Sequence, residues 1–235
     1  MHEPVQPIIE GGQIGENGYL RPDEVNRILS AYGLPVCGAE LVALDGDLAA
    51  VAERLSYPLA LKIFGESIVH KSDFGGVVLG IDDARALEDA RSQMRSELET
   101  SGMLDRVEGM MVQEMAAPGK EVILGMAIDP KFGPILMFGM GGKYVEITQD
   151  IAFRVMPVTD VDAWEMVKAI KSYPLLEGVR GEPRVDIDFI IESIQRLAQL
   201  VDDVPSILEL DMNPVIITPD RASCRVVDAR IRISR

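Results

Sequence analysis

The chain has 235 residues, of which 47% are hydrophobic and 26% are charged, as is usual for a globular protein. No apolar run approaches the roughly 20 residues that a membrane-spanning helix needs, and the first residues lack the basic-then-apolar pattern of a signal peptide, so we expect a cytoplasmic protein. The net charge of −15, without any long run of Lys or Arg, opposes binding to the phosphate backbone of a nucleic acid.

Residues 1–20 are rich in glycine and proline, and their lack of periodicity predicts an extended arm. A helix is predicted to begin at Arg21, because acidic residues follow in its first turn and apolar residues then recur at helical spacing. Gly33 fits the C-terminal cap of this helix. The chain then predicts a strand at 35–44, a helix at 46–56, strands at 58–63 and 75–81, and a helix at 84–100.

Three short apolar segments follow, and each is bounded by glycine or proline. They predict buried strands at 109–115, 121–128 and 134–139. Two helices, at 161–172 and 187–200, and two strands, at 207–211 and 225–228, complete the prediction. Strand–helix units, an antiparallel stretch and a final helix with strands favour an α/β or α+β fold with two lobes.

Lys62 stands among apolar residues in the predicted strand 58–63. A buried lysine is costly unless its ammonium group meets an anion or reaches water. The pattern therefore fits a phosphate-binding lysine and an edge-strand lysine that faces solvent equally well.

His70 is one of only two histidines, and the small, polar and glycine residues after it indicate an exposed loop. A neutral imidazole is a good nucleophile near neutral pH and can carry a phosphoryl group. Gly75 and Gly76 would let the backbone approach a phosphate closely. Taken alone, the pattern is also that of an ordinary histidine in a surface loop.

Glu114 and Met115 end an apolar segment, and Glu121 follows in the next one. Backbone groups at the end of such a strand would lie beside a flat ring, and a carboxylate one strand away would accept hydrogen bonds from ribose hydroxyls. A solvated β-hairpin explains this pattern equally well.

A glycine-rich turn from Gly139 to Gly142 would form either a tight turn or a backbone nest for phosphate. Arg154 stands on a further apolar segment, where an arginine favours a bidentate anion. Both features are compatible with a ligand that carries phosphate groups.

The most specific local pattern is ELDMNP, from Glu209 to Pro214. Alternation along a strand would place Glu209, Asp211 and Asn213 on one face. Oxygen ligands of this kind suit Mg²⁺, which commonly bridges protein and phosphate groups. Asp228 ends the next predicted strand, and pairing of the two strands would bring it close to Asn213.

Four separated motifs resemble those of one family, the ATP-grasp (β) subunits of ADP-forming acetyl-CoA and acyl-CoA synthetases, in the succinyl-CoA synthetase superfamily. The motifs are HKSDFGGV from His70, a glycine- and FR-containing pattern at 141–157, RGEP with Val185 and Asp186, and ELDMNP from Glu209. They occur in the order of the family, and the resemblance extends from about Arg21 to Asp228.

The resemblance implies an ATP-grasp fold of the α/β (α+β) class, in which two lobes enclose a nucleotide cleft. It implies an N-terminal arm at 1–20 and a first lobe with the phosphohistidine loop at 21–110. The second lobe, with the Mg²⁺–nucleotide site, would cover 111–235.

The resemblance further implies an ADP-forming acid–CoA ligase of the acetate–CoA ligase type. His70 would carry a phosphoryl group between a phosphohistidine of the CoA-binding α subunit and ADP, and Asp211 would orient or stabilise the phosphorylated form. Mg²⁺ would be held by Asn213 and Asp228. The residues that would bind ATP or ADP are Lys62, Gly75, Gly76, Glu114, Met115, Glu121 and Arg154. The expected assembly is α2β2, without nucleic acid or membrane.

Two other functions stay open. An ATP-grasp ligase that works through a free acyl phosphate has no need of a phosphohistidine, so His70 argues against it. A regulatory nucleotide-binding module of a synthetase-like or acyltransferase assembly would be expected to have lost residues such as Lys62, Asp211 or Asn213. The acyl substrate and the choice between ADP and GDP are also open.

Overall fold

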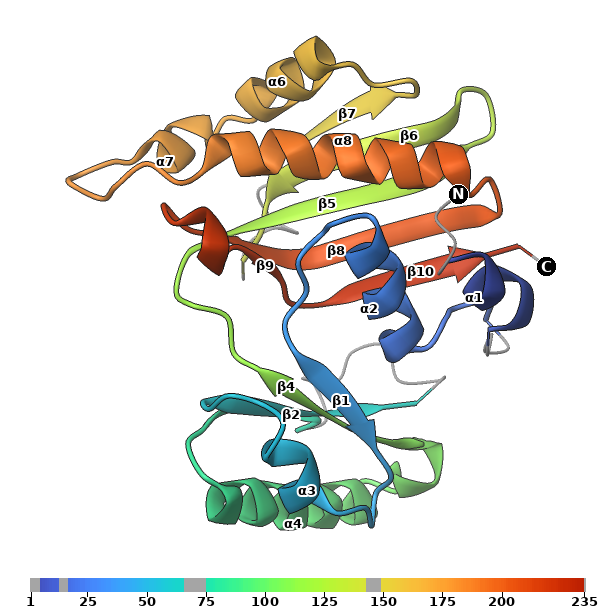
Figure 1. The fold of residues 1–235 in the computed structure, drawn as a ribbon, viewed down its shortest axis with the longest axis vertical. Helices are drawn as coiled ribbons and strands as arrows, with labels where there is room; N and C mark the ends of the chain where they lie inside the picture. Colours follow the sequence, from blue (N-terminus) through green and yellow to red (C-terminus); the bar gives the residue numbers. More distant parts are fainter. Residues whose placement is uncertain (1–4, 13–16, 66–74, 143–148, 235) are drawn as a thin grey trace. The chain divides into compact units, whose positions relative to one another are not determined.

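The chain forms two compact units, one from Cys37–Met115 and one from Met1–Val36 with Ala116–Arg235, called here the small and the large unit. The computed structural model describes residues 5–12, 17–65, 75–142 and 149–234 (Figure 1). The boundaries of these units differ from those of the predicted lobes, which were 21–110 and 111–235. Helix α2 (Pro22–Ala31) belongs to the large unit, because its Val25, Ile28 and Leu29 are buried in that unit's core.

The small unit is a four-stranded antiparallel sheet with two helices. The strands lie in the order β1 (Ala39–Val42), β4 (Gly109–Glu114), β2 (Leu59–Phe64) and β3 (Val77–Ile81), and the helices are α3 (Leu48–Ala52) and α4 (Ala84–Thr100), with a short 3-10 turn, η2 (Leu104–Arg106). Leu59, Leu61 and Ile63 of β2 share a buried core with apolar residues of α4. Alternation along β2 therefore turns Lys62 to the face opposite these helices.

Helix α4 has the bounds that the sequence predicted, because its N-terminal cap and its apolar spacing are strong local patterns. Asp83 caps its N-terminus by accepting a hydrogen bond from the Ala86 N–H at 2.8 Å. Leu87, Met94 and Leu98 recur at helical spacing and are buried.

The large unit is built on an antiparallel sheet with the strand order β10-β8-β5-β6-β7, and β9 also pairs with β8. Its strands are β5 (Lys120–Asp129), β6 (Gly133–Met140), β7 (Ile151–Val155), β8 (Ile207–Ile217), β9 (Arg225–Val226) and β10 (Ala229–Ile233). Its remaining helices are α1 (Gln6–Gly11), α6 (Asp160–Ala169), α7 (Tyr173–Glu177) and α8 (Ile187–Asp203), with a 3-10 turn, η3 (Arg221–Ser223).

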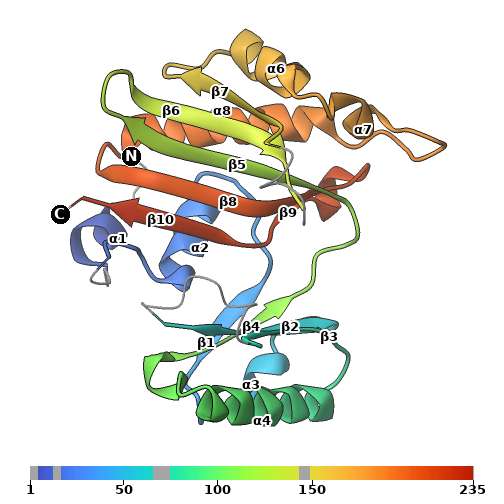
Figure 2. The same ribbon diagram turned by 180° about the vertical axis from the view of Figure 1, so that it is seen from behind.

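Helix α8 covers one face of this sheet, which we call the covered face (Figure 1). The register partners Met212, Leu124, Phe138 and Ala152 form a buried row on the covered face. The residues between them point to the other side, called here the open face, and Figure 2 views the sheet from that side. Glu209 and Asp211 lie on the open face.

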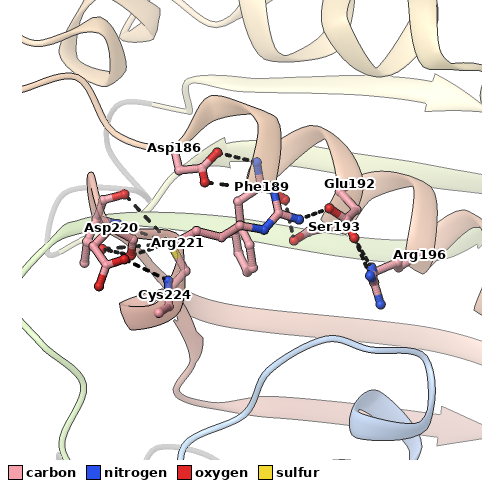
Figure 3. Close-up of polar contacts among 10 residues, drawn as sticks. Asp186, Phe189, Glu192, Ser193, Arg196, Asp220, Arg221 and Cys224 are labelled. Atoms are coloured by element: carbon pink, nitrogen blue, oxygen red, sulfur yellow. Dashed lines mark hydrogen bonds and ion pairs between the residues drawn. The ribbon is translucent and has the colours of Figure 1, made fainter.

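Charged residues at the start of α8 and in η3 hold this helix in place (Figure 3). Asp186 caps the helix by accepting a hydrogen bond from the Phe189 N–H at 2.8 Å. Glu192 forms ion pairs with both Arg196 and Arg221, and the Arg221 guanidinium lies 5.6 Å from the centre of the Phe189 ring. The RGEP motif thus leads into an anchored helix start.

Residues 5–12 and 17–20 do not form the extended arm that the sequence predicted. Val5 and Ile8 are buried around α1, and the Leu20 N–H donates to the Ile231 carbonyl of β10 at 3.0 Å. The short helix contains too few turns to show periodicity in the sequence. In the part of the chain that the structure describes, no helix combines the length and apolar character needed to cross a bilayer.

Candidate functional site

Lys62 is a buried cation in the middle of the small unit's sheet. Strand β2 lies between β4 and β3, so the alternative of an edge-strand lysine is excluded. The residue is only 7% exposed, and no hydrogen bond or ion pair from the described residues reaches its ammonium group. A buried ammonium without a counter-ion is costly, and an anion would offset that cost.

Glu114 and Met115 are held tightly at the end of β4. The Glu114 carboxylate accepts a hydrogen bond from the Ser56 N–H at 2.8 Å. The Glu114 N–H donates to the Gly38 carbonyl at 2.8 Å, and the Met115 N–H donates to the Pro58 carbonyl at 3.0 Å. Both backbone donors are therefore used inside the small unit. The Met115 sulfur accepts a hydrogen bond from the Gly80 N–H at 3.0 Å, while the residue stays 39% exposed.

Gly75 and Gly76 lead into strand β3. Gly75 has a φ of +68°, a backbone conformation that favours glycine, and the nearest atom to a Cβ there would be Oε2 at the movable end of the exposed Glu97 side chain. The Gly76 carbonyl accepts a hydrogen bond from the Ile63 N–H at 2.9 Å, which fixes this end of the loop to β2. His70 lies outside the described residues.

Asp211 and Asn213 lie on the open face of β8, as alternation predicted, because Leu210 and Met212, which alternate with them, are buried. The Asn213 N–H donates to the Asp228 carbonyl at 2.9 Å, which confirms that the two residues are close. The large unit thus gathers three of the predicted residues in one place.

Asp211 is the electrostatically unusual member of this group. Burial raises its pKa, and the nearby carboxylates of Asp228 and Glu209 raise it further, whereas Arg230 opposes the shift. No described residue donates a hydrogen bond to its carboxylate. A cation or an N–H donor placed here would relieve the repulsion.

The metal prediction rests on a pair of residues rather than on a full ligand cage. Among the described residues, no group of three or more His, Cys, Asp and Glu side chains is arranged to hold a metal ion. Asn213 and Asp228 offer two oxygen-bearing side chains. This number fits Mg²⁺ bound together with a nucleotide, since Mg²⁺ commonly takes one or two protein ligands and completes its shell with phosphates and water.

Glu121 lies beside the glycine-rich turn after β6. Its carbonyl accepts a hydrogen bond from the Gly141 N–H at 2.8 Å, and a Cβ on Gly142 would lie 3.8 Å from its Oε2. The side chain is exposed, and alternation along β5 places it on the same open face as Asp211.

Arg154 does not join these residues. Its register partner on β6 is the buried Leu136, so Arg154 projects on the covered face, opposite to Asp211. Its guanidinium lies 3.5 Å from the Glu165 carboxylate of α6. The sequence suggested a phosphate ligand, but the structure supplies the anion from α6, and we leave Arg154 out of the proposed site.

Asp150 is a structural carboxylate to which the sequence assigned no role. It is buried, and its two oxygens accept hydrogen bonds from the Lys171 and Ser172 N–H groups, each at 2.7 Å. Burial acts to raise the pKa of Asp150, but the hydrogen bonds from Ser172 and Lys171 outweigh it and hold the pKa below its usual range. Asp150 therefore anchors the segment after α6 to the start of β7.

Comparison with known proteins decides the family. Residues 14–233 match the model of the ATP-grasp domain. The chain belongs to the ATP-grasp family. This ATP-grasp chain is 39% identical over 225 residues to the acetate–CoA ligase [ADP-forming] I subunit beta of Pyrococcus furiosus, covering 95% of each. It is 40% identical to the 4-hydroxybutyrate–CoA ligase [ADP-forming] of Nitrosopumilus maritimus, but it spans only 30% of that protein's length.

Solved structures give the same ATP-grasp assignment. The chain superposes on acetyl-coenzyme A synthetase 1 of Ca. Korarchaeum cryptofilum in complex with coenzyme A and Ca-AMPCP, with a TM-score of 0.86, 35% identity and 98% coverage of both chains. A second structure of that enzyme, with coenzyme A and Mg-AMPPCP, has its phosphohistidine segment pointing towards the nucleotide binding site (TM-score 0.81, 34% identity, 99% of both chains). The predicted ATP-grasp fold is confirmed.

Proposed function

We propose that this chain is the nucleotide-binding subunit of an ADP-forming acyl-CoA synthetase. With a CoA-binding partner it would convert acyl-CoA, ADP and phosphate into the free acid, CoA and ATP. The observation that carries the proposal is the likeness to a separate β subunit along 95% of both chains. The partner would be the CoA-binding α subunit, which we assign to an α2β2 assembly with this chain.

Within the small unit, we assign phosphate binding to Lys62 and the Gly75–Gly76 backbone, and contact with the base to Met115. The buried ammonium of Lys62, which has no partner among the described residues, supports its role, because a phosphate would supply a counter-ion. Glu114 keeps a supporting role, since its carboxylate is already bonded to Ser56.

Within the large unit, Asn213 and Asp228 would hold Mg²⁺, and Glu121 would accept hydrogen bonds from ribose hydroxyls. When bound, Mg²⁺ neutralises charge on the phosphates as the phosphoryl group moves. Support comes from the short distance between Asn213 and Asp228 and from the exposure of Glu121 on the same open face as Asp211.

His70 would carry the phosphoryl group. Its imidazole nitrogen attacks the phosphorus of the partner's phosphohistidine, so one N–P bond forms as the other breaks. A terminal oxygen of ADP then attacks the same phosphorus, which releases a neutral imidazole and gives ATP. The Asp211 carboxylate would accept a hydrogen bond from the other ring nitrogen and hold the ring in position, and its lack of a donor among the described residues supports this role.

A reconstitution assay tests this function. The chain is mixed with the CoA-binding subunit of its own organism, acetyl-CoA, ADP, phosphate and Mg²⁺, and ATP formation is followed. We expect ATP only when both subunits and phosphate are present. Binding of nucleotide without any ATP formation in the complete mixture would instead favour a regulatory module.

A further inference from the structure

The open face of the large unit carries a groove built from two cross-strand rows. Each row runs from β8 across β5 and β6 to the edge strand β7. The first row is Asp211, Gly125, Met137 and Phe153, and the second is Glu209, Ala127, Ile135 and Val155. Each row therefore begins with a carboxylate, continues with a small residue and ends with two larger apolar side chains.

The small residues of β5 create the groove. A hollow of about 380 Å³ lies here, with Ala127 at its floor, Glu209 and Asp211 on one flank, and Ile135 and Met137 on the other. A Cβ on Gly125 would lie 3.1 Å from Met137 Cε, so the methionine side chain lies over the glycine. The hollow is thus apolar on one side and acidic on the other.

The apolar flank of the groove is unusually exposed. Phe132 at the β5–β6 turn is 64% exposed, Phe153 is 55% and Val155 is 45%. We call these three residues the apolar patch; Phe153 and Val155 lie on β7 opposite Met137 and Ile135 of the open face, and Phe132 lies in the turn before β6. Figure 2 shows β6 and β7 from the open side. Exposed apolar side chains that gather in this way mark an interaction surface, whereas single exposed residues do not.

We propose that the groove and the apolar patch dock the CoA-binding partner subunit. This inference rests on the proposed function. The matching part makes up only 30% of the 4-hydroxybutyrate–CoA ligase of Nitrosopumilus maritimus. In the proposed function, a CoA-binding partner has to reach this chain to pass on the phosphoryl group. The groove ends at Asp211, so a segment seated in it would approach the proposed catalytic carboxylate.

The chemistry of the groove specifies the docking segment. The apolar patch takes aliphatic or aromatic side chains, and the acidic flank takes a Lys or Arg beside them. A second copy of this chain fits poorly, because two copies of net charge −15 would each present Glu209 and Asp211.

The test measures binding between the chain and the CoA-binding subunit of its own organism. Phe153→Asp introduces a charge into the patch, and Ala127→Leu fills the floor of the groove at an exposed position without adding charge. Val161→Asp is the matched control, because Val161 is 66% exposed on α6, outside the patch. Thermal unfolding and Mg²⁺–ADP binding by each isolated variant check its fold, and Phe153→Thr replaces the aspartate variant if that one fails to fold.

We expect Phe153→Asp to weaken the affinity for the partner by about 30-fold or more, Ala127→Leu by about 10-fold, and Val161→Asp by less than about 2-fold. Wild-type affinity in both groove variants would overturn the docking surface while leaving the proposed function standing. A wild-type chain that does not bind the partner at all would overturn the proposed partnership itself. Self-association that Phe153→Asp abolishes would identify a second copy as the occupant, and would overturn the proposal.

Discussion

At the scale of single residues, hydrogen-bond partners separate two kinds of charged side chain. Those that hold the fold have such partners, whereas two of those proposed for chemistry have none among the described residues. Lys62 and Asp211 are buried or half-buried charges without a hydrogen-bond partner among the described residues. Asp150 and Glu114, in contrast, are bonded to backbone N–H groups. Unrelieved charge is costly to the free protein, so its presence points to a ligand.

Asp211 should reduce the stability of the free protein at neutral pH. Its pKa in the folded state is raised above the unfolded value, so the folded state holds the proton more tightly and stability falls as the pH rises through the folded pKa. We expect Asp211→Asn to be more stable than wild type above that pH, with the difference vanishing below the unfolded pKa near about 4. Urea unfolding across pH 3 to 8 measures this; a variant less stable than wild type at pH 7 would contradict it.

Asn213 should matter for the metal–nucleotide complex and little for the fold. Its side chain is exposed on the open face, so Asn213→Ala removes one oxygen ligand without leaving a cavity. We expect the affinity for Mg²⁺–ADP to fall by about tenfold, while the affinity for ADP in the presence of a chelator stays the same. Calorimetric titration with Mg²⁺–ADP, and with ADP plus a chelator, measures the two affinities separately. Equal losses with and without Mg²⁺ would show that Asn213 does not act through the metal.

Asp150→Ala should destabilise the large unit by roughly 2 to 3 kcal/mol, because two backbone N–H groups lose their acceptors. The pKa of Asp150 is lowered in the fold, so its contribution is present above the unfolded pKa and is lost as the pH falls through the folded pKa. Asp162→Ala, at an exposed capping carboxylate of α6, is the comparison. Denaturant unfolding at pH 7 measures both, and equal costs would weaken the anchoring role of Asp150.

At the scale of elements, the sequence predicted what local patterns determine. Helix α4 and strands β4, β5 and β6 have strong periodicity and clear boundaries, and they were found. Helix α1 and strands β7 and β10 were missed. The residues Ala229–Ile233 alternate between apolar and charged types, which is a strand signal that could have found β10.

The assignment of Arg154 shows what local patterns cannot supply. The face on which a strand residue projects depends on its register with neighbouring strands and on which face the helices cover. Both are decided by pairing with distant segments, so the sequence had no means of placing Arg154 on the covered face. Asp211 and Asn213 were placed correctly because they alternate with the buried Leu210 and Met212 on the same strand.

The N-terminal cap of α4 gives a test at this scale. Asp83→Ala should cost about 1 kcal/mol, because the Ala86 N–H loses its acceptor. Asp89 lies on the same helix with a side chain that is 77% exposed, so Asp89→Ala should cost little. Thermal unfolding of the two variants provides the comparison. A cost for Asp89→Ala as large as that for Asp83→Ala would argue against capping.

At the scale of the whole molecule, we propose a subunit that completes the synthesis of ATP only together with a CoA-binding partner. Four motifs in order predicted the ATP-grasp family, and the match over residues 14–233 confirmed it. The groove on the open face was not predicted, because it arises where four strands align Gly125 and Ala127 between larger residues. Such an alignment exists only in the folded sheet.

The most direct test of the central claim is phosphorylation of the purified chain. It is incubated with Mg²⁺ and ATP labelled at the γ-phosphate, and wild type is compared with His70→Ala and with His2→Ala, which removes the only other histidine. We predict acid-labile, base-stable label on wild type and His2→Ala and none on His70→Ala, with nucleotide bound equally by all three. Wild-type labelling of His70→Ala, or no label on a wild-type chain that binds ATP, would contradict the role of His70 as phosphoryl carrier.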